Sequence, residues 1–125
     1  MSIVPEFLIK KVYRKGSLKE TDEGISFELK NILGSGEITG IGYIQINDTV
    51  YESPMIKIIT AGLSIVADSI SPENPIVLRL NQEGKLLLEG AKGLKDGINN
   101  IIMEIMNPEA GKVKVSLTDT VRLSI

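Results

Sequence analysis

The sequence of 125 residues contains no cysteine, no histidine and no tryptophan. Without cysteine it has no disulfide framework, no zinc site of the cysteine type and no cysteine nucleophile. Without histidine it lacks the usual general base near neutral pH and the commonest metal ligand. Tryptophan, a favoured side chain at binding hot spots, is also missing. We therefore expect no metal, no cofactor and no catalysis by this chain on its own.

No charge of one sign dominates. The chain has 14 lysines and arginines, 16 aspartates and glutamates, and a net charge of −2. This balance gives no strong field that would attract nucleic acid or an anionic membrane, so we expect neither as a partner. The densest basic run consists of Lys10, Lys11, Arg14, Lys15 and Lys19. It contains a single aromatic residue, Tyr13, and is interpreted as a solvated edge strand.

Long hydrophobic runs are also absent. Met1 to Glu6 lacks the basic region and the apolar run of roughly 7–15 residues that mark a signal peptide. These features predict a cytoplasmic location and no membrane span. Apolar residues make up 42% of the chain and aromatic ones only 4%. Isoleucine is abundant, and together with the many Lys and Glu residues this is a thermophile-like composition.

The apolar residues that are present alternate with polar ones, which is the pattern of half-buried strands. Ile25, Phe27 and Leu29 share one parity, and Asn47-Asp48 predicts a tight hairpin turn. The glycine-rich stretch 34–42 lacks the third glycine and the helix of a dinucleotide fingerprint, so it is interpreted as a loop and a bulged strand. Turn signals recur about every 8–15 residues, which predicts one all-β domain over residues 1–125. An antiparallel, immunoglobulin-like β-sandwich is favoured, with a closed β-barrel as the alternative.

The last expected strand, Lys112 to Ile125, contains one anomaly. Asp119 shares the parity of its apolar residues, where a buried carboxyl group is costly unless it is hydrogen-bonded. We favour a bulge or bend at 118–120, where the strand would cross between sheets. The alternative is a site carboxylate that faces a cavity.

The strand expected before it, from Ile98 to Met106, is apolar at both parities. Ile101, Met103 and Ile105 share one parity; Ile98, Ile102 and Met106 share the other. Only one face of a sandwich strand can point into the core. We therefore expect the second set to form an interface, in a homo-oligomer or in a complex with another protein.

Two resemblances add to this interpretation. Residues 94–101 resemble the corner before the penultimate strand of immunoglobulin-like modules, with Asn99 at or near the place of the usual tyrosine. The segments YRKGSLK (13–19), GISFEL (24–29), TGIGYIQIND (39–48) and GLKDG (93–97) resemble the small β-subunit family of C-glycoside deglycosidases and its uncharacterised relatives. In that family the β-sandwich subunit pairs with a TIM-barrel partner that holds the metal and the proton-transfer residues.

The sequence thus predicts a non-catalytic accessory subunit or protein-interaction module. The resemblance implies the small partner of a TIM-barrel sugar-processing enzyme. The alternative is a small carbohydrate-binding or carboxylate-based enzyme domain with a site in its loops. That site would use acids such as Asp48, Asp68 and Glu73 together with Tyr43 or Tyr51.

Overall fold

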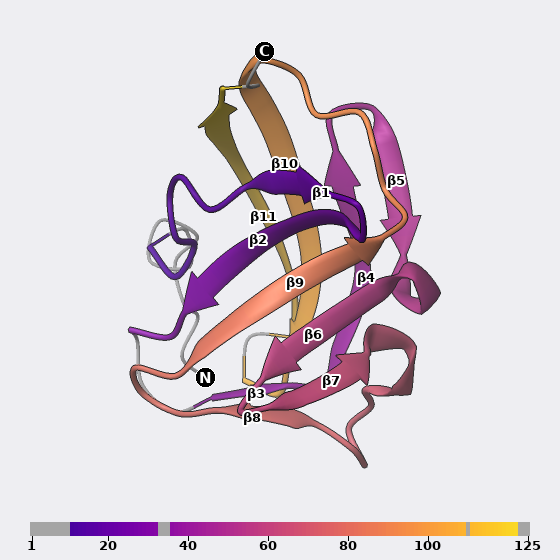
Figure 1. The fold of residues 1–125 in the computed structure, drawn as a ribbon. Coiled ribbons are helices and arrows are strands. Elements are labelled where there is room, and N and C mark those ends of the chain that lie inside the picture. The colour runs from indigo at the N-terminus through magenta and orange to yellow at the C-terminus, as the bar shows by residue number, and fades with distance from the viewer. Residues whose placement is uncertain (1–10, 33–35, 110, 123–125) are drawn as a thin grey trace.

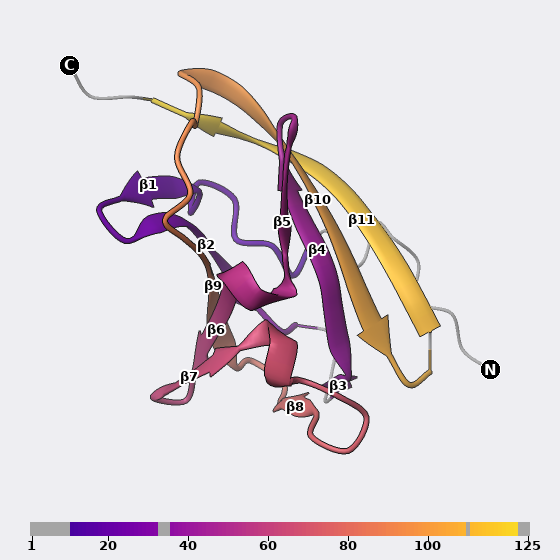
Figure 2. The same ribbon diagram turned by 90° about the vertical axis from the view of Figure 1, so that its right-hand side faces the viewer.

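The computed structural model describes residues 11–32, 36–109 and 111–122. Within these residues the chain forms two antiparallel sheets that face each other as layers (Figures 1 and 2). The strand order of the first sheet is β1-β2-β9-β6-β7, and that of the second is β11-β10-β4-β5. The predicted β-sandwich is therefore confirmed. The end strands of both sheets pair on one side only, so the described strands do not close into a barrel.

The five-stranded sheet is built around two hairpins and a late central strand. Its strands are β1 (Lys19–Thr21), β2 (Gly24–Lys30), β9 (Glu83–Glu89), β6 (Ile56–Thr60) and β7 (Leu63–Val66). The β6–β7 turn places Ala61 and Gly62 in the left-handed region, as a two-residue hairpin requires.

The four-stranded sheet carries the longest strands. Its members are β11 (Gly111–Val121), β10 (Gly97–Asn107), β4 (Gly40–Ile46) and β5 (Thr49–Glu52). The predicted turn at Asn47-Asp48 joins β4 to β5, with Asn47 at a φ of 54°. A small ribbon of β3 (Gly36–Ile38) and β8 (Ile76–Leu78) lies at one end, and 3-10 turns cover 53–55 and 67–69.

The strand order matches the immunoglobulin arrangement. There, strands B, E and D share one sheet and strands G, F and C the other, with C′ added in the variable type. Here β2, β9 and β6 take the places of B, E and D, while β11, β10, β4 and β5 take those of G, F, C and C′. The penultimate strand of that plan is therefore β10.

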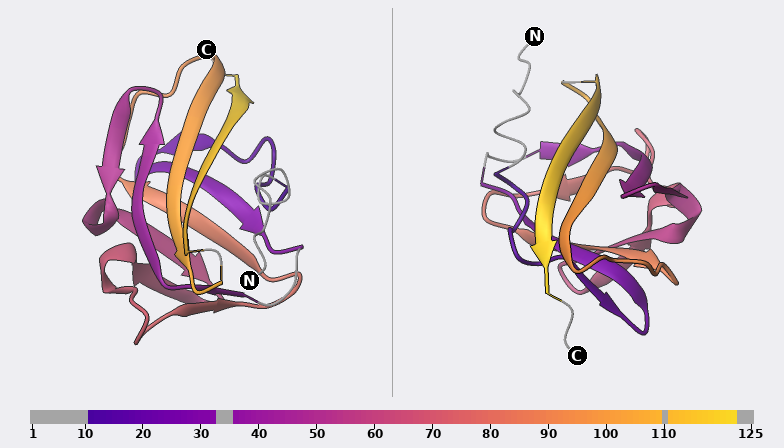
Figure 3. Two further views of the ribbon diagram at one scale, coloured as in Figure 1. Left: turned by 180° about the vertical axis from the view of Figure 1, so that it is seen from behind. Right: turned by 90° about the horizontal axis from the view of Figure 1, so that it is seen from above.

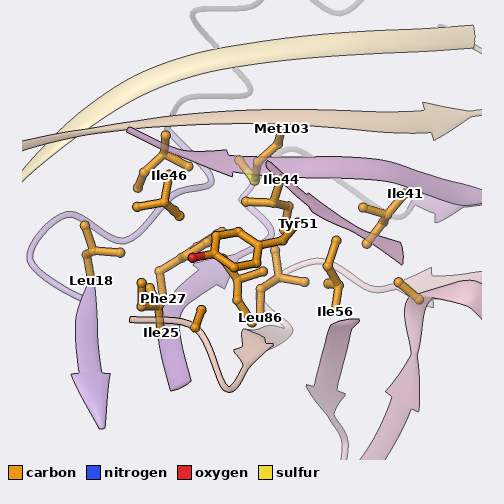
Figure 4. Close-up of a cluster of buried hydrophobic side chains, with 14 of the residues drawn as sticks. Leu18, Ile25, Phe27, Ile41, Ile44, Ile46, Tyr51, Ile56, Leu86 and Met103 are labelled. Atoms are coloured by element: carbon orange, nitrogen blue, oxygen red, sulfur yellow. The ribbon is translucent and has the colours of Figure 1, made fainter. Parts of the chain in front are cut away.

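The core lies between the two sheets and is filled mainly by isoleucine and leucine (Figure 4). Ile25 and Phe27 point inward from β2, as their alternation predicts, and both are fully buried. They meet Ile44 and Met103 from the opposite sheet across this layer. β-Branched and leucine side chains suit such a pleated, two-sided core.

The start of the five-stranded sheet differs from the expected edge strand. Lys11 and Val12 form a turn before an isolated bridge between Tyr13 and Leu29. A 3-10 turn at Ser53–Met55 precedes β6, because Pro54 cannot donate to a ladder. Of the basic run, Lys19 lies on an edge strand, whereas Lys11, Arg14 and Lys15 lie before it and Lys10 is outside the described residues.

Candidate functional site

Asp119 is buried on the inner face of β11, and its carboxyl group is bound from three directions. Its Oδ2 accepts a hydrogen bond from the Tyr13 hydroxyl at 2.7 Å and another from the Gly16 N–H at 2.8 Å. Its Oδ1 accepts the Thr120 N–H at 2.8 Å. The carboxyl group thus ties the segment before β1 to the last strand of the opposite sheet.

The bend or bulge expected at 118–120 is not what the structure contains. β11 stays in one sheet, and its register with β10 runs from Gly111 to Val121 without a shift. The carboxyl group is tolerated because Tyr13 and Gly16 satisfy it from outside the strand. A kink in β11 is therefore unnecessary.

Tyr13 completes this contact from a buried position. Its ring packs against Phe27 with centroids 5.5 Å apart. Burial of the ring raises the pKa of the Tyr13 hydroxyl far above its usual value, and the hydrogen bond to Asp119 raises it further. The hydroxyl therefore stays protonated over the physiological range and acts as a fixed donor.

Asn99 lies beside Asp119 on the inner face, opposite it in the β10–β11 register. Its side chain accepts the Lys95 N–H at 2.9 Å and donates to the Lys95 carbonyl oxygen at 2.9 Å. It also accepts a hydrogen bond from Asn47 Nδ2 at 2.9 Å. Asn99 therefore anchors the corner before β10 and attaches it to the β4–β5 turn, which is the task of the tyrosine in immunoglobulin domains.

We call Tyr13, Asp119, Asn99 and Asn47 the polar end of the sandwich. Two shallow hollows of the described surface are lined by Arg14 and Glu83 beside the five-stranded sheet, and Tyr13 reaches one of them. Neither of these two is lined by Asp119 or Asn99. Asp119 is buried and both of its oxygens accept hydrogen bonds, so it holds the fold together.

The loop acids and tyrosines of the alternative enzyme site do not converge. Tyr51 is buried in the core, whereas its β4 neighbour Tyr43 has the opposite parity and lies on the outer face of the sheet. Asp68 accepts a hydrogen bond from the Ser53 hydroxyl. Across residues 11–32, 36–109 and 111–122, no three His, Cys, Asp or Glu side chains come together as a metal site would require.

The outer face of the four-stranded sheet is the second surface of interest (Figure 3, left). Ile98, Ile102 and Met106 lie on it, as the parity of β10 predicts, because Ile101 and Met103 point into the core. Ile98 is 67% exposed, whereas Ile102 and Met106 are half-buried. Asn100 and Glu104 alternate with them, so the face is mixed rather than continuously apolar.

Two glycines of β4 shape this face. The sequence predicted the bulge in this strand but not the side chains that these glycines accommodate. The register between β4 and β10 shifts between Glu104 and Ile105, which confirms the expected bulge. A side chain at Gly40 would collide with the Met106 sulfur, and one at Gly42 with the Glu104 carboxyl group. The long side chains of β10 therefore lie flat over β4.

Comparison with known proteins decides the family. A family model described as hydroxymethylglutaryl-CoA reductase, N-terminal domain, matches residues 8–122. The chain belongs to this family. No curated protein matches its sequence. None of the described residues of this reductase N-terminal domain forms a helix long and apolar enough to cross a membrane.

This family replaces the resemblance to the C-glycoside deglycosidase β-subunit, which is wrong. Glycines in two of the motifs that carried the resemblance serve the packing of the sandwich. Gly24 has a φ of 141° and lies against the backbone of Leu88 and Gly90, while Gly40 and Gly42 accommodate side chains from β10. Such glycines and alternating apolar residues recur in unrelated sandwiches. The TIM-barrel partner that the resemblance implied is withdrawn with it.

Proposed function

We propose that this reductase N-terminal domain is a non-catalytic module that acts through protein contacts, beside a catalytic region of the hydroxymethylglutaryl-CoA reductase type. The observation that carries the proposal is the outer face of the four-stranded sheet. Ile98 and Val50 are more than half exposed on it, beside the half-buried Ile102, Met106 and Tyr43. Exposed apolar side chains that share one face with charged residues are a feature of protein-binding surfaces.

The polar end supports the non-catalytic part of the same proposal. Its carboxyl and amide groups are engaged in hydrogen bonds that hold the strands and the corner together. A general acid or base must reach a substrate atom within hydrogen-bond distance. Asp119 is enclosed and cannot do so. It stabilises the fold instead.

The test has two measurements on the purified chain. First, we expect no conversion of hydroxymethylglutaryl-CoA by the chain alone when a reduced nicotinamide cofactor is supplied, monitored by chromatography of the thioester. Second, we expect it to associate with a separately prepared reductase catalytic region, measured by sedimentation velocity. Ile98→Asp should weaken that association by tenfold or more, because it places an unpaired carboxylate in the contact.

Leu80→Asp is the matched control, since Leu80 is also exposed but lies in the turn between β8 and β9. It should leave the affinity unchanged. Turnover by the chain alone would contradict the non-catalytic assignment. Absence of association, or an equal loss in both variants, would contradict the assignment of the outer face as the contact surface.

A further inference from the structure

The outer face carries one row of side chains that crosses all four strands. In register order the row is Lys114, Glu104, Tyr43 and Glu52, on β11, β10, β4 and β5 respectively. It begins with a positive charge at one edge of the sheet and ends with a negative charge at the other. Lys114 and Glu52 are both exposed, and neither is ion-paired with another described residue.

We propose that a second copy of the domain covers this face when no reductase region is bound, through a two-fold axis parallel to the strands. This inference rests on the proposed function, because it names one occupant of the same face. Rotation about that axis reverses the order of the row. Lys114 then lies over Glu52 of the second copy, and Tyr43 lies over Glu104 of the second copy. Each of these pairs forms twice.

The geometry of stacked sheets permits these pairs. Packed sheets lie about 10 Å apart, a gap that extended lysine and glutamate side chains can bridge together. Aligned sheets are rotated by about 30° from each other. This rotation displaces the side chains farthest from the centre of the face the most. The row is next to the centre of the face, between the row of Met106 and that of Ile102. The twist therefore displaces its paired side chains little.

The next row brings apolar side chains over polar ones. It contains Ser116, Ile102, Gln45 and Val50 in register. Under the same rotation Ile102 lies over Gln45 of the second copy, and Val50 lies over its Ser116. On the other side of the charged row, the Met106 side chain folds over Gly40. It therefore projects little from the sheet and lets the two copies approach.

The size of the face predicts a weak dimer. Four strands about 4.8 Å apart span about 19 Å, and eight residues along the longer strands span about 27 Å. The face therefore covers at most about 500 Å² per copy, because β5 has only four residues. Twice this area is near the lower limit of specific interfaces. We therefore expect a dissociation constant in the micromolar range or above, and a dimer that strengthens at low salt.

Charge reversal tests the arrangement. Lys114→Glu and Glu52→Lys each create two like-charge contacts per dimer, and each should raise the dissociation constant about tenfold. The double variant restores opposite charges in both contacts, so its dissociation constant should return to within about threefold of the original. Sedimentation equilibrium at about 10–500 µM measures this range.

The controls reverse the same charges on other parts of the surface. Lys19→Glu on β1 and Glu73→Lys in the turn before β8 should leave dimerisation unchanged. Circular dichroism establishes that each variant is folded. A chain that stays monomeric up to 500 µM in low salt overturns the dimer, as does a double variant no better than the single ones. Neither result removes association with a reductase region, so failure of this inference is distinguishable from failure of the proposed function.

Discussion

Tyr13 and Asp119 are 106 residues apart in the chain, yet their side chains share a buried hydrogen bond of 2.7 Å. The bond joins the segment that precedes the five-stranded sheet to the end strand of the four-stranded sheet. It therefore crosses the sandwich at the polar end, where the apolar core gives way to hydrogen-bonded side chains.

Removing the Tyr13 hydroxyl should destabilise the domain. In Tyr13→Phe the ring can still pack on Phe27, but Asp119 Oδ2 keeps only the Gly16 N–H. A buried acceptor that loses one of its partners costs about 1–3 kcal/mol of unfolding free energy. Urea unfolding at neutral pH measures the loss. Tyr43→Phe is the control at dilute concentration, and a loss of similar size there would show that the hydrogen bond is not the cause.

The same tyrosine predicts a loss of stability at alkaline pH. Burial, and then the contact with Asp119, raise the pKa of Tyr13 in the folded state above its unfolded value near 10. The folded state then holds a proton that the unfolded state releases. The corresponding stability is complete below about pH 10 and falls by up to about 1.4 kcal/mol per pH unit above it.

The difference between the original chain and Tyr13→Phe isolates this contribution from other groups that titrate in the same range. Unfolding curves between pH 8 and about 11 should show a steeper decline for the original chain. Parallel declines would mean that Tyr13 ionises as easily in the folded state as in the unfolded one.

Two serines should respond in opposite ways to replacement by alanine. Ser26 is buried in β2, and its hydroxyl oxygen has no hydrogen-bond partner among the residues that the structure describes. Ser17 donates to the Arg14 carbonyl oxygen and accepts the Glu28 N–H. Ser26→Ala should be neutral or stabilise by about 1 kcal/mol, whereas Ser17→Ala should destabilise by about 1 kcal/mol. Thermal unfolding of both variants decides this, and a marked destabilisation by Ser26→Ala would reveal an unrecognised role for its hydroxyl.

Gly24 should be intolerant of any side chain. Its φ is 141°, and an added Cβ would overlap the Leu88 carbonyl oxygen and lie 2.8 Å from the Gly90 nitrogen. Both are backbone atoms that cannot move aside, so we expect Gly24→Ala to cost more than about 2 kcal/mol. Gly36→Ala meets nothing within 4 Å and should change stability by less than about 0.5 kcal/mol. Equal urea midpoints for the two variants would show that the end of the β2–β9 ladder at Gly24 rearranges freely.

The sequence was informative wherever structure follows from local periodicity. Alternation placed Ile25 and Phe27 in the core, Ile98 on the outer face and Asp119 on the inner face of β11. It could not identify what satisfies Asp119, because Tyr13 and Gly16 are distant in the chain and carry no periodic signal. The bend was inferred for lack of a known partner, and long-range hydrogen bonds made it unnecessary.

The family and the charged row were beyond local reasoning for different reasons. Short glycine motifs report backbone requirements shared by many sandwiches, so they pointed to a wrong family. The row from Lys114 to Glu52 becomes visible only when the register of three strand pairs is known. Each of its members is an ordinary surface residue in the sequence.

One inner strand of each sheet, β9 and β10, comes late in the chain, and this affects how the domain is made. Before residue 83 leaves the ribosome, the available strand pairs are β1–β2, β4–β5, β6–β7 and β3–β8. β9 joins the first hairpin to the third, and β10 then joins β4 to β11. At about 5–20 residues per second, the early hairpins spend several seconds with their apolar sides uncovered. The nascent chain therefore exposes these apolar sides until β9 and β10 emerge.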